Sequence, residues 1–216
     1  VFTYDELKII ADLAIKYDAY VITDEVYEHI VYAPNKHIYM ASLPGMRERT
    51  IVCNSLSKTY SITGWRLGYV IANPQVIDRV KKVHDFLTVG AAAPLMEAAV
   101  TGLKFGDDYY EGLAAHYTHM KELFCGGLKN LGFTFTEPQG AYYVLMDVSE
   151  FGVKDDVKFC EWMTEHVGVA AVPGSSFFRE DVHNLIRFHF AKKDETLNAA
   201  LDNLATLRAK ADGFKE

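Results

Sequence analysis

The residues best suited to chemistry lie together in one polar segment, residues 55–69. The segment contains two hydroxyls (Ser55 and Ser57), a primary amine (Lys58) and a guanidinium (Arg66). Hydroxyls and a guanidinium suit phosphate oxygens, whereas a lysine amine can contact a phosphate or act as a nucleophile. The segment therefore indicates an anion-binding site, although solvated surface charges would explain the two cations about equally well from spacing alone.

Short apolar runs rich in β-branched residues flank this segment and predict the strands that position it. These strands are expected at residues 19–23, 50–54 and 67–72. A Thr3–Glu6 capping box opens an amphipathic helix before the first strand, and a helix beginning at Pro74 follows the third. This alternation is typical of an α/β fold with a mostly parallel sheet, which binds ligands beyond the carboxyl ends of its strands.

The pattern changes in the second half of the chain. Residues 91–131 are mostly helical with a break at 106–108, and a smaller α+β unit follows. Its strands are expected at residues 133–136, 141–147, 169–172 and 185–190, and its helices at residues 155–166 and 194–210. We therefore predict two domains: residues 1–108 as part of a larger sheet domain, and residues 109–216 as a linker helix with a small C-terminal domain.

Composition narrows the class of protein. Of 216 residues, 50% are hydrophobic and 24% are charged, which indicates a globular chain rather than a disordered one. The net charge of −7 and the pI near 5.6 argue against nucleic-acid binding. No apolar run approaches the ~20 residues of a membrane span. Three widely spaced cysteines suggest neither a disulfide framework nor a metal site, and the opening residues look like no targeting peptide. A cytoplasmic location is expected.

Several chemically distinct residues at fixed spacing give the polar segment a family resemblance. The string Ser55-x-Ser57-Lys58-x5-Gly64-x-Arg66-x-Gly68-Tyr69 closely resembles the lysine motif of class I/II aminotransferases, which are fold-type-I pyridoxal-phosphate enzymes. A second match, Asp24-Glu25-Val26-Tyr27, stands upstream at the end of a predicted strand. The resemblance covers essentially the whole chain but only the C-terminal half of the family's usual length.

The resemblance implies a role for each matching residue toward pyridoxal 5′-phosphate. Lys58 would bond the cofactor's aldehyde and then shuttle the proton at the substrate Cα. Asp24 would pair with the pyridinium nitrogen, and Tyr27 would donate its hydroxyl to the phenolate oxygen. Ser55, Ser57 and Arg66 would hold the phosphate.

Arg187 is unusual because its guanidinium lies inside an otherwise apolar predicted strand. A charged group at such a place must be paired or face a cleft. The resemblance implies that it binds the substrate α-carboxylate through two hydrogen bonds. A structural salt bridge is the alternative. His116 and His119 share a helical face, but no third ligand accompanies them, so no metal is expected.

We therefore predict that the protein is an aminotransferase that moves an amino group from an L-amino acid to a 2-oxo acid. Aromatic or kynurenine-like substrates are weakly preferred. A β-lyase of the same fold remains an alternative, since the same electron sink serves elimination. A non-catalytic remnant or interaction module is another, because the first-half cofactor residues cannot be assigned in this sequence. The resemblance also implies a homodimer for the full-length parent and little activity for residues 1–216 alone.

Overall fold

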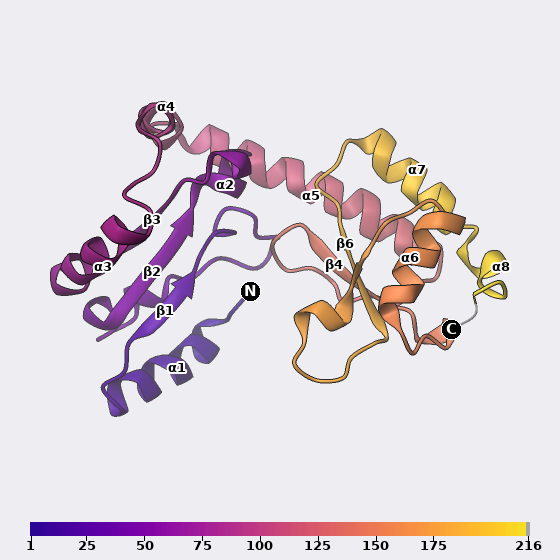
Figure 1. Ribbon diagram of the computed structural model, residues 1–216, viewed down its shortest axis with the longest axis horizontal. Coiled ribbons are helices and arrows are strands. Elements are labelled where there is room, and N and C mark those ends of the chain that lie inside the picture. The colour runs from indigo at the N-terminus through magenta and orange to yellow at the C-terminus, as the bar shows by residue number, and fades with distance from the viewer. Residues whose placement is uncertain (215–216) are drawn as a thin grey trace. The chain divides into compact units, whose positions relative to one another are not determined.

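The computed structural model describes residues 1–214, and the chain forms two compact units, Val1–Ala114 and Ala115–Glu216. Each unit contains its own three-stranded sheet (Figure 1). The division falls within the long helix α5 (Asp107–Asn130). The α/β fold class is thus confirmed. None of the helices in residues 1–214 combines the length and apolarity that a membrane crossing needs.

The sheet of the first unit contains the three predicted strands. They are β1 (Val21–Asp24), β2 (Thr50–Ser55) and β3 (Gly68–Ile71), in the order β1-β2-β3. Strands β1 and β2 are parallel, but β2 and β3 are antiparallel. This part of the sheet is therefore mixed rather than mostly parallel. The reason is the connection: residues 56–67 contain only short helical turns, so the chain folds back beside β2 instead of crossing over.

Helix α1 (Tyr4–Lys16) begins at the predicted capping box. The Thr3 hydroxyl accepts a hydrogen bond from Glu6 N at 3.3 Å, and the Glu6 carboxylate accepts one from Thr3 N at 2.7 Å. The apolar side of α1 packs in a core cluster against the segment between β1 and β2. The buried members of this cluster are Leu7, Ala11, Ala14, Met40, Leu43 and Met46. After β3 come α3 (Pro74–Leu87) and α4 (Ala93–Leu103).

The second unit packs helices against an antiparallel sheet. Its strands are β4 (Tyr143–Asp147), β5 (Val172–Pro173) and β6 (Leu185–His189), in the order β4-β6-β5. Its later helices are α6 (Asp156–His166), α7 (Asp194–Leu204) and α8 (Leu207–Ala211). Fully buried aromatic and aliphatic side chains from helices and strands form the core of this unit. They include Phe124, Leu128, Met146, Phe159, Met163, Ile186, Phe190 and Leu204.

Three details of the second unit differ from the sequence-based expectations. The strand predicted at residues 169–172 is shortened and shifted to the two-residue β5, Val172–Pro173. The strand predicted at residues 133–136 is reduced to one bridge, between Phe135 and Met146. Pro138 follows almost at once and cannot donate to a ladder, which limits the pairing. The helix predicted at residues 194–210 is interrupted, since α7 ends at Leu204 and α8 begins at Leu207.

Candidate active site

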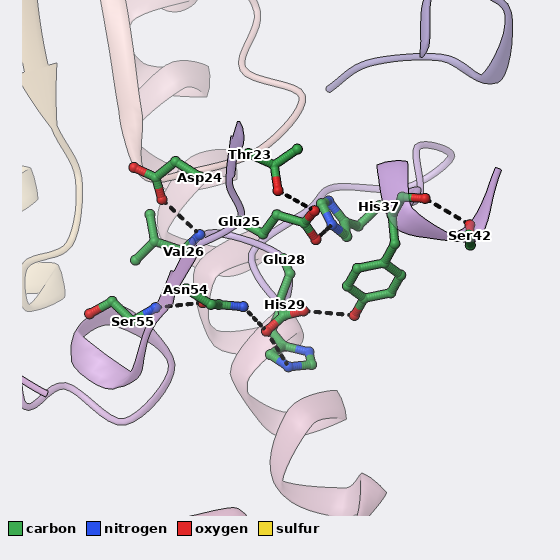
Figure 2. Close-up of polar contacts among 11 residues, drawn as sticks. Thr23, Asp24, Glu25, Val26, Glu28, His29, His37, Ser42, Asn54 and Ser55 are labelled. Atoms are coloured by element: carbon green, nitrogen blue, oxygen red, sulfur yellow. Dashed lines mark hydrogen bonds and ion pairs between the residues drawn. The ribbon is translucent and has the colours of Figure 1, made fainter. Parts of the chain in front are cut away.

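Asp24 and Ser55 lie at the carboxyl ends of neighbouring parallel strands. Asp24 ends β1 opposite Cys53 of β2, and Ser55 ends β2 two residues later. The Asp24 carboxylate is exposed, and its Oδ1 accepts a hydrogen bond from Val26 N at 3.3 Å (Figure 2). The strand register therefore brings a carboxylate and a hydroxyl, 31 positions apart in the sequence, to one edge of the sheet.

Ser55 and Ser57 form a hydroxyl pair at the start of the short helix α2 (Leu56–Thr59). Ser55 Oγ accepts a hydrogen bond from Ser57 N at 3.1 Å and thus caps the helix. The two hydroxyl oxygens are 2.7 Å apart, and Ser55 Oγ also lies 3.1 Å from Leu67 O. Both hydroxyls are therefore fixed beside the same backbone turn.

Lys58 lies in the middle of this hydroxyl-capped helix and is half-buried. Backbone hydrogen bonds hold the residues on either side of Lys58. Ile62 N donates to Ser57 O at 3.0 Å, and Leu56 N donates to Leu67 O at 3.1 Å. The Tyr109 hydroxyl, also in the first unit, donates to Thr59 O at 2.7 Å. The backbone of Lys58 is thus held on both sides, which fixes the point from which its amine extends.

Arg66 adopts a left-handed backbone conformation, with φ of +57°. This region is unfavourable for a residue with a side chain, and such strain often accompanies functional positions. The Arg66 guanidinium is exposed and donates to Thr63 O at 2.8 Å. The Thr63 hydroxyl in turn donates to Ser57 O at 3.3 Å. Arg66 is therefore connected through one residue to the turn that carries the hydroxyl pair.

The structure explains one of the two glycines in the lysine motif, Gly68, but not the other, Gly64. A Cβ at Gly68 would come within 2.7 Å of Asn54 O, so a side chain there would force β2 and β3 apart. A Cβ at Gly64 meets nothing within 4 Å. Close backbone approach therefore explains Gly68, whereas packing among the described residues does not explain Gly64.

Tyr27 lies on the turn that follows β1, three residues beyond Asp24. The turn is closed by hydrogen bonds from Glu28 N to Glu25 O at 3.0 Å and from Ile30 N to Tyr27 O at 2.9 Å. Tyr27 itself is half-buried. The turn thus places the tyrosine beyond the same strand end as the aspartate.

Two glutamates without a predicted role, Glu25 and Glu28, hold this turn in place through hydrogen bonds. Glu25 is 4% exposed, and its carboxylate accepts a hydrogen bond from the Thr23 hydroxyl at 2.8 Å and lies 2.9 Å from His37 Nε2. Glu28 accepts hydrogen bonds from Asn54 Nδ2 at 2.6 Å and from the Tyr39 hydroxyl at 2.7 Å. Figure 2 shows the Glu25 carboxylate beside Thr23 and His37, and the Glu28 carboxylate beside Asn54 of β2.

The Glu25, Glu28 and His37 ligand atoms lie within 4.8 Å of one another, as in some metal sites. However, all four carboxylate oxygens of the two glutamates already have protein partners. Hydrogen bonds therefore account for this cluster without a cation. The cluster positions the turn that carries Tyr27, because Glu28 of that turn is hydrogen-bonded to Asn54, the neighbour of Ser55. The sequence signal for this cluster was the presence of two glutamates within four residues of the end of β1.

Burial shifts the pKa of groups in both units, beginning with Tyr39 and His29 of the first unit and ending with two cysteines of the second. Burial and then the hydrogen bond to Glu28 raise the pKa of Tyr39, so its phenol remains protonated. Burial lowers the pKa of His29, which favours its neutral form. Burial also raises the pKa of the Cys125 and Cys160 thiols to about 12. Both cysteines are therefore structural rather than nucleophilic.

Arg187, in the second unit, lies on β6 between Leu145 of β4 and Val172 of β5. Its guanidinium carbon is 3.7 Å from the centre of the Phe177 ring and 4.2 Å from that of Tyr143. No hydrogen bond or ion pair joins it to another of residues 1–214. A structural salt bridge with those residues therefore does not explain this cation. On the same unit, His119 is bonded to Asp194 at 2.8 Å.

Comparison with known proteins assigns the chain to a family. The sequence profile of aminotransferase class I and II matches residues 1–204. The chain belongs to this family. It is 36% identical over 192 residues to the methionine aminotransferase of Escherichia coli, covering 88% of this chain and 50% of that protein. It is 37% identical over 220 residues to human kynurenine–oxoglutarate transaminase 3, covering 93% and 48% respectively.

Solved aminotransferase structures have the same fold. The N-succinyldiaminopimelate aminotransferase of Mycobacterium tuberculosis superposes with a TM-score of 0.91 at 33% identity, covering 96% of this chain and 54% of that one. The aromatic aminotransferase of Pyrococcus horikoshii gives 0.89 at 34% identity, covering 97% and 57%. The chain thus spans about half the length of the relatives that it matches. The family resemblance, the fold class and the pyridoxal phosphate cofactor of the family are confirmed.

The side chains of the first unit fit this cofactor chemically. A protonated pyridine nitrogen needs a carboxylate, a phosphate needs hydroxyls and a guanidinium, and an aldehyde needs a primary amine. Asp24, the hydroxyl pair, Arg66 and Lys58 supply these groups from β1, β2 and the connection to β3. The donor set therefore matches the pyridine nitrogen, the phosphate and the aldehyde of pyridoxal phosphate.

Proposed function

We propose that the whole protein containing this chain is a pyridoxal-phosphate-dependent aminotransferase that moves an amino group from an L-amino acid to a 2-oxo acid. One observation carries the proposal: in a chain of the aminotransferase family, a hydroxyl-capped helix holds Lys58 at the carboxyl end of β2, beside the strand that ends at Asp24. A primary amine so placed is suited to hold an aldehyde cofactor.

In this proposal each residue of the first unit has a distinct task. The bound cofactor supplies an electron-accepting ring and a carbonyl group that receives the amino group. Lys58 holds the cofactor covalently and moves the proton at the substrate Cα, since an amine can both bond a carbonyl carbon and act as a base. Asp24 keeps the ring nitrogen protonated, and Tyr27 donates a hydrogen bond to the ring oxygen.

The phosphate contacts have a different purpose, which is retention and orientation. Ser55 and Ser57 donate through hydroxyls that α2 already holds 2.7 Å apart. Arg66 adds a charged donor, and hydrogen bonds from a charged group are about twice as strong as neutral ones. Arg187 binds the substrate carboxylate, because its in-plane N–H donors match two carboxylate oxygens.

The remaining features of the proposal concern the whole protein. The relative named for kynurenine supports the weak preference for aromatic or kynurenine-like substrates, whereas the relative named for methionine points to an aliphatic thioether substrate. A homodimer and a cytoplasmic location are proposed by analogy with the family. We also propose that residues 1–216 alone are inactive, because other cofactor contacts of the family cannot be assigned in this sequence.

The test is covalent trapping in the whole protein. The protein is loaded with pyridoxal phosphate, reduced with borohydride and digested, and the adduct is located by mass spectrometry. We expect the adduct on Lys58 in the wild type and none in Lys58→Ala, whereas Lys81→Ala, which removes an exposed lysine of α3, retains it. An adduct that persists in Lys58→Ala would refute the assignment of the lysine.

Product analysis then tests the reaction type. A panel of L-amino acids with 2-oxoglutarate should yield glutamate and a new 2-oxo acid if the enzyme is a transaminase. Ammonia and pyruvate released from a substrate with a β leaving group, without glutamate, would instead establish the lyase alternative.

A further inference from the structure

Two aromatic rings flank the Arg187 guanidinium. Tyr143 is the first residue of β4, whereas Phe177 ends the 3-10 helix η5 (Gly174–Phe177). Their ring centres lie 4.2 Å and 3.7 Å from the guanidinium carbon. Both distances are well within the ~6 Å of cation–π attraction, which stabilises a guanidinium lying against a ring. The rings therefore restrict the rotation of the side chain.

The ring contacts leave the in-plane donors of Arg187 without a protein acceptor among residues 1–214. A guanidinium carries five N–H donors in its plane, and a ring contacts the face of that plane instead. The side chain is also half-buried, so its donors have lost part of their water. This combination suits an anion that approaches along the edge of the guanidinium plane.

One buried carboxylate fastens the loop that carries Phe177. Asp156, at the start of α6, has no exposed surface. Its Oδ2 accepts a hydrogen bond from Ser175 N at 2.8 Å, and its Oδ1 lies 2.8 Å from His183 Nδ1. Because Ser175 precedes Phe177 and His183 follows it, a single side chain ties the loop on both sides of the ring.

Close packing fixes the start of the same loop. Gly174 is buried, and a methyl group there would overlap the carbonyl oxygen of Leu185. Leu185 begins β6, and Arg187 follows two residues later on that strand. The loop is thus pressed against the strand that carries the cation, and only a glycine permits that approach.

Core packing does not account for the position of Phe177. The residue is 44% exposed, so it buries far less surface than a core phenylalanine. Its neighbour Phe178 is similarly exposed, at 37%, but has no cation–π contact with Arg187. The two phenylalanines therefore form a matched pair that differs in the ring contact.

We propose that Phe177 is a positioning residue for substrate carboxylate binding: its ring and that of Tyr143 orient the Arg187 guanidinium, and Asp156 anchors the loop through Ser175 N and His183. This inference rests on the proposed role of Arg187. It adds that the affinity for the carboxylate depends on the Asp156-anchored loop, residues 174–184, and not on Arg187 alone. The loop contributes orientation and no contact with the reacting atoms.

The test measures KM and kcat of the whole holoenzyme with the L-amino acid that gives the highest kcat/KM in a panel. The variants are Phe177→Leu, Phe177→Tyr, Phe178→Leu, His183→Ala and Arg187→Ala. Loss of one cation–π contact should raise KM about three- to tenfold in Phe177→Leu and leave kcat within about twofold. Phe177→Tyr, which keeps a ring, should retain the wild-type KM, and so should Phe178→Leu. His183→Ala, which loosens one anchor, should raise KM in the same direction.

The outcomes separate this inference from the proposed function. If Arg187→Ala leaves KM unchanged, or if the panel contains no substrate, the proposed carboxylate role fails and the inference fails with it. If Arg187→Ala raises KM but Phe177→Leu does not, the inference is overturned and the proposed function stands. Equal effects of Phe177→Leu and Phe178→Leu would indicate general loop packing and would also overturn it.

Discussion

Two adjacent glycines of α5 provide a quantitative test of the packing in the second unit. A Cβ at Gly126 would meet nothing within 4 Å. A Cβ at Gly127 would overlap both Cδ atoms of Leu201 on α7 and would lie 3.0 Å from its Cγ. The substitutions Gly126→Ala and Gly127→Ala therefore add the same methyl group to the same helix, with and without a steric conflict.

The expected free energies follow from two opposing effects. Replacing a glycine by alanine inside a helix stabilises it by about 0.5–1 kcal/mol. Extra atoms in a packed site cost about 1–3 kcal/mol, and the half-buried Leu201 can yield in part. Gly126→Ala should therefore raise the free energy of unfolding by about 0.5–1 kcal/mol. Because both variants gain the same helix propensity, Gly127→Ala should be about 1–3 kcal/mol less stable than Gly126→Ala.

Urea unfolding of the single variants, followed by circular dichroism, measures this difference. Leu201→Ala provides the control, since it removes the atoms that the new methyl group meets. In that background Gly126→Ala and Gly127→Ala should have nearly equal effects. Equal stabilisation by both substitutions in the wild-type background would refute the close contact between α5 and α7.

Two further predictions concern charged residues. Arg66→Gly should relieve the left-handed strain and raise the free energy of unfolding by about 0.5–1 kcal/mol. The same substitution should speed loss of pyridoxal phosphate from the whole protein on dialysis. A raised free energy of unfolding in urea together with unchanged cofactor retention would contradict the phosphate role. Hydrogen bonds to Asp156 on α6 and to Asp181 on the loop raise the pKa of His183 above its ordinary 6.5. The folded state therefore favours protonated His183. The stability advantage of the wild type over His183→Gln should be complete below pH 6.5 and should decline as the pH rises through the raised pKa. A pH-independent difference between the free energies of unfolding of the two proteins would refute the charged contact.

The sequence alone determined most of the first unit, because its signals are local. The Thr3–Glu6 capping box marks the start of α1, and three β-branched runs mark β1, β2 and β3. The lysine segment is contiguous, so its hydroxyls, amine and guanidinium were visible as one motif. Arg187 was visible as a charge within an apolar strand. Their roles toward the cofactor and substrate remain predictions.

Tertiary structure decided the features that depend on pairing between distant segments. The antiparallel return of β3 follows from a connection too short to cross over. The reduction of residues 133–136 to one bridge depends on contact with β4. In both cases the sequence specifies a local preference for extended backbone, but the partner and direction arise only when strands from different positions meet.

The surroundings of Arg187 illustrate the same limit most clearly. Phe177 is one of 13 phenylalanines, and nothing in its local sequence distinguishes a ring that flanks a cation from one that packs in a core. Asp156 and His183 are 27 positions apart, and they meet because α6 and the loop before β6 pack together. The sequence therefore determined which residue carries the charge, whereas the fold determined what orients it, since orientation depends on contacts among side chains from separate elements.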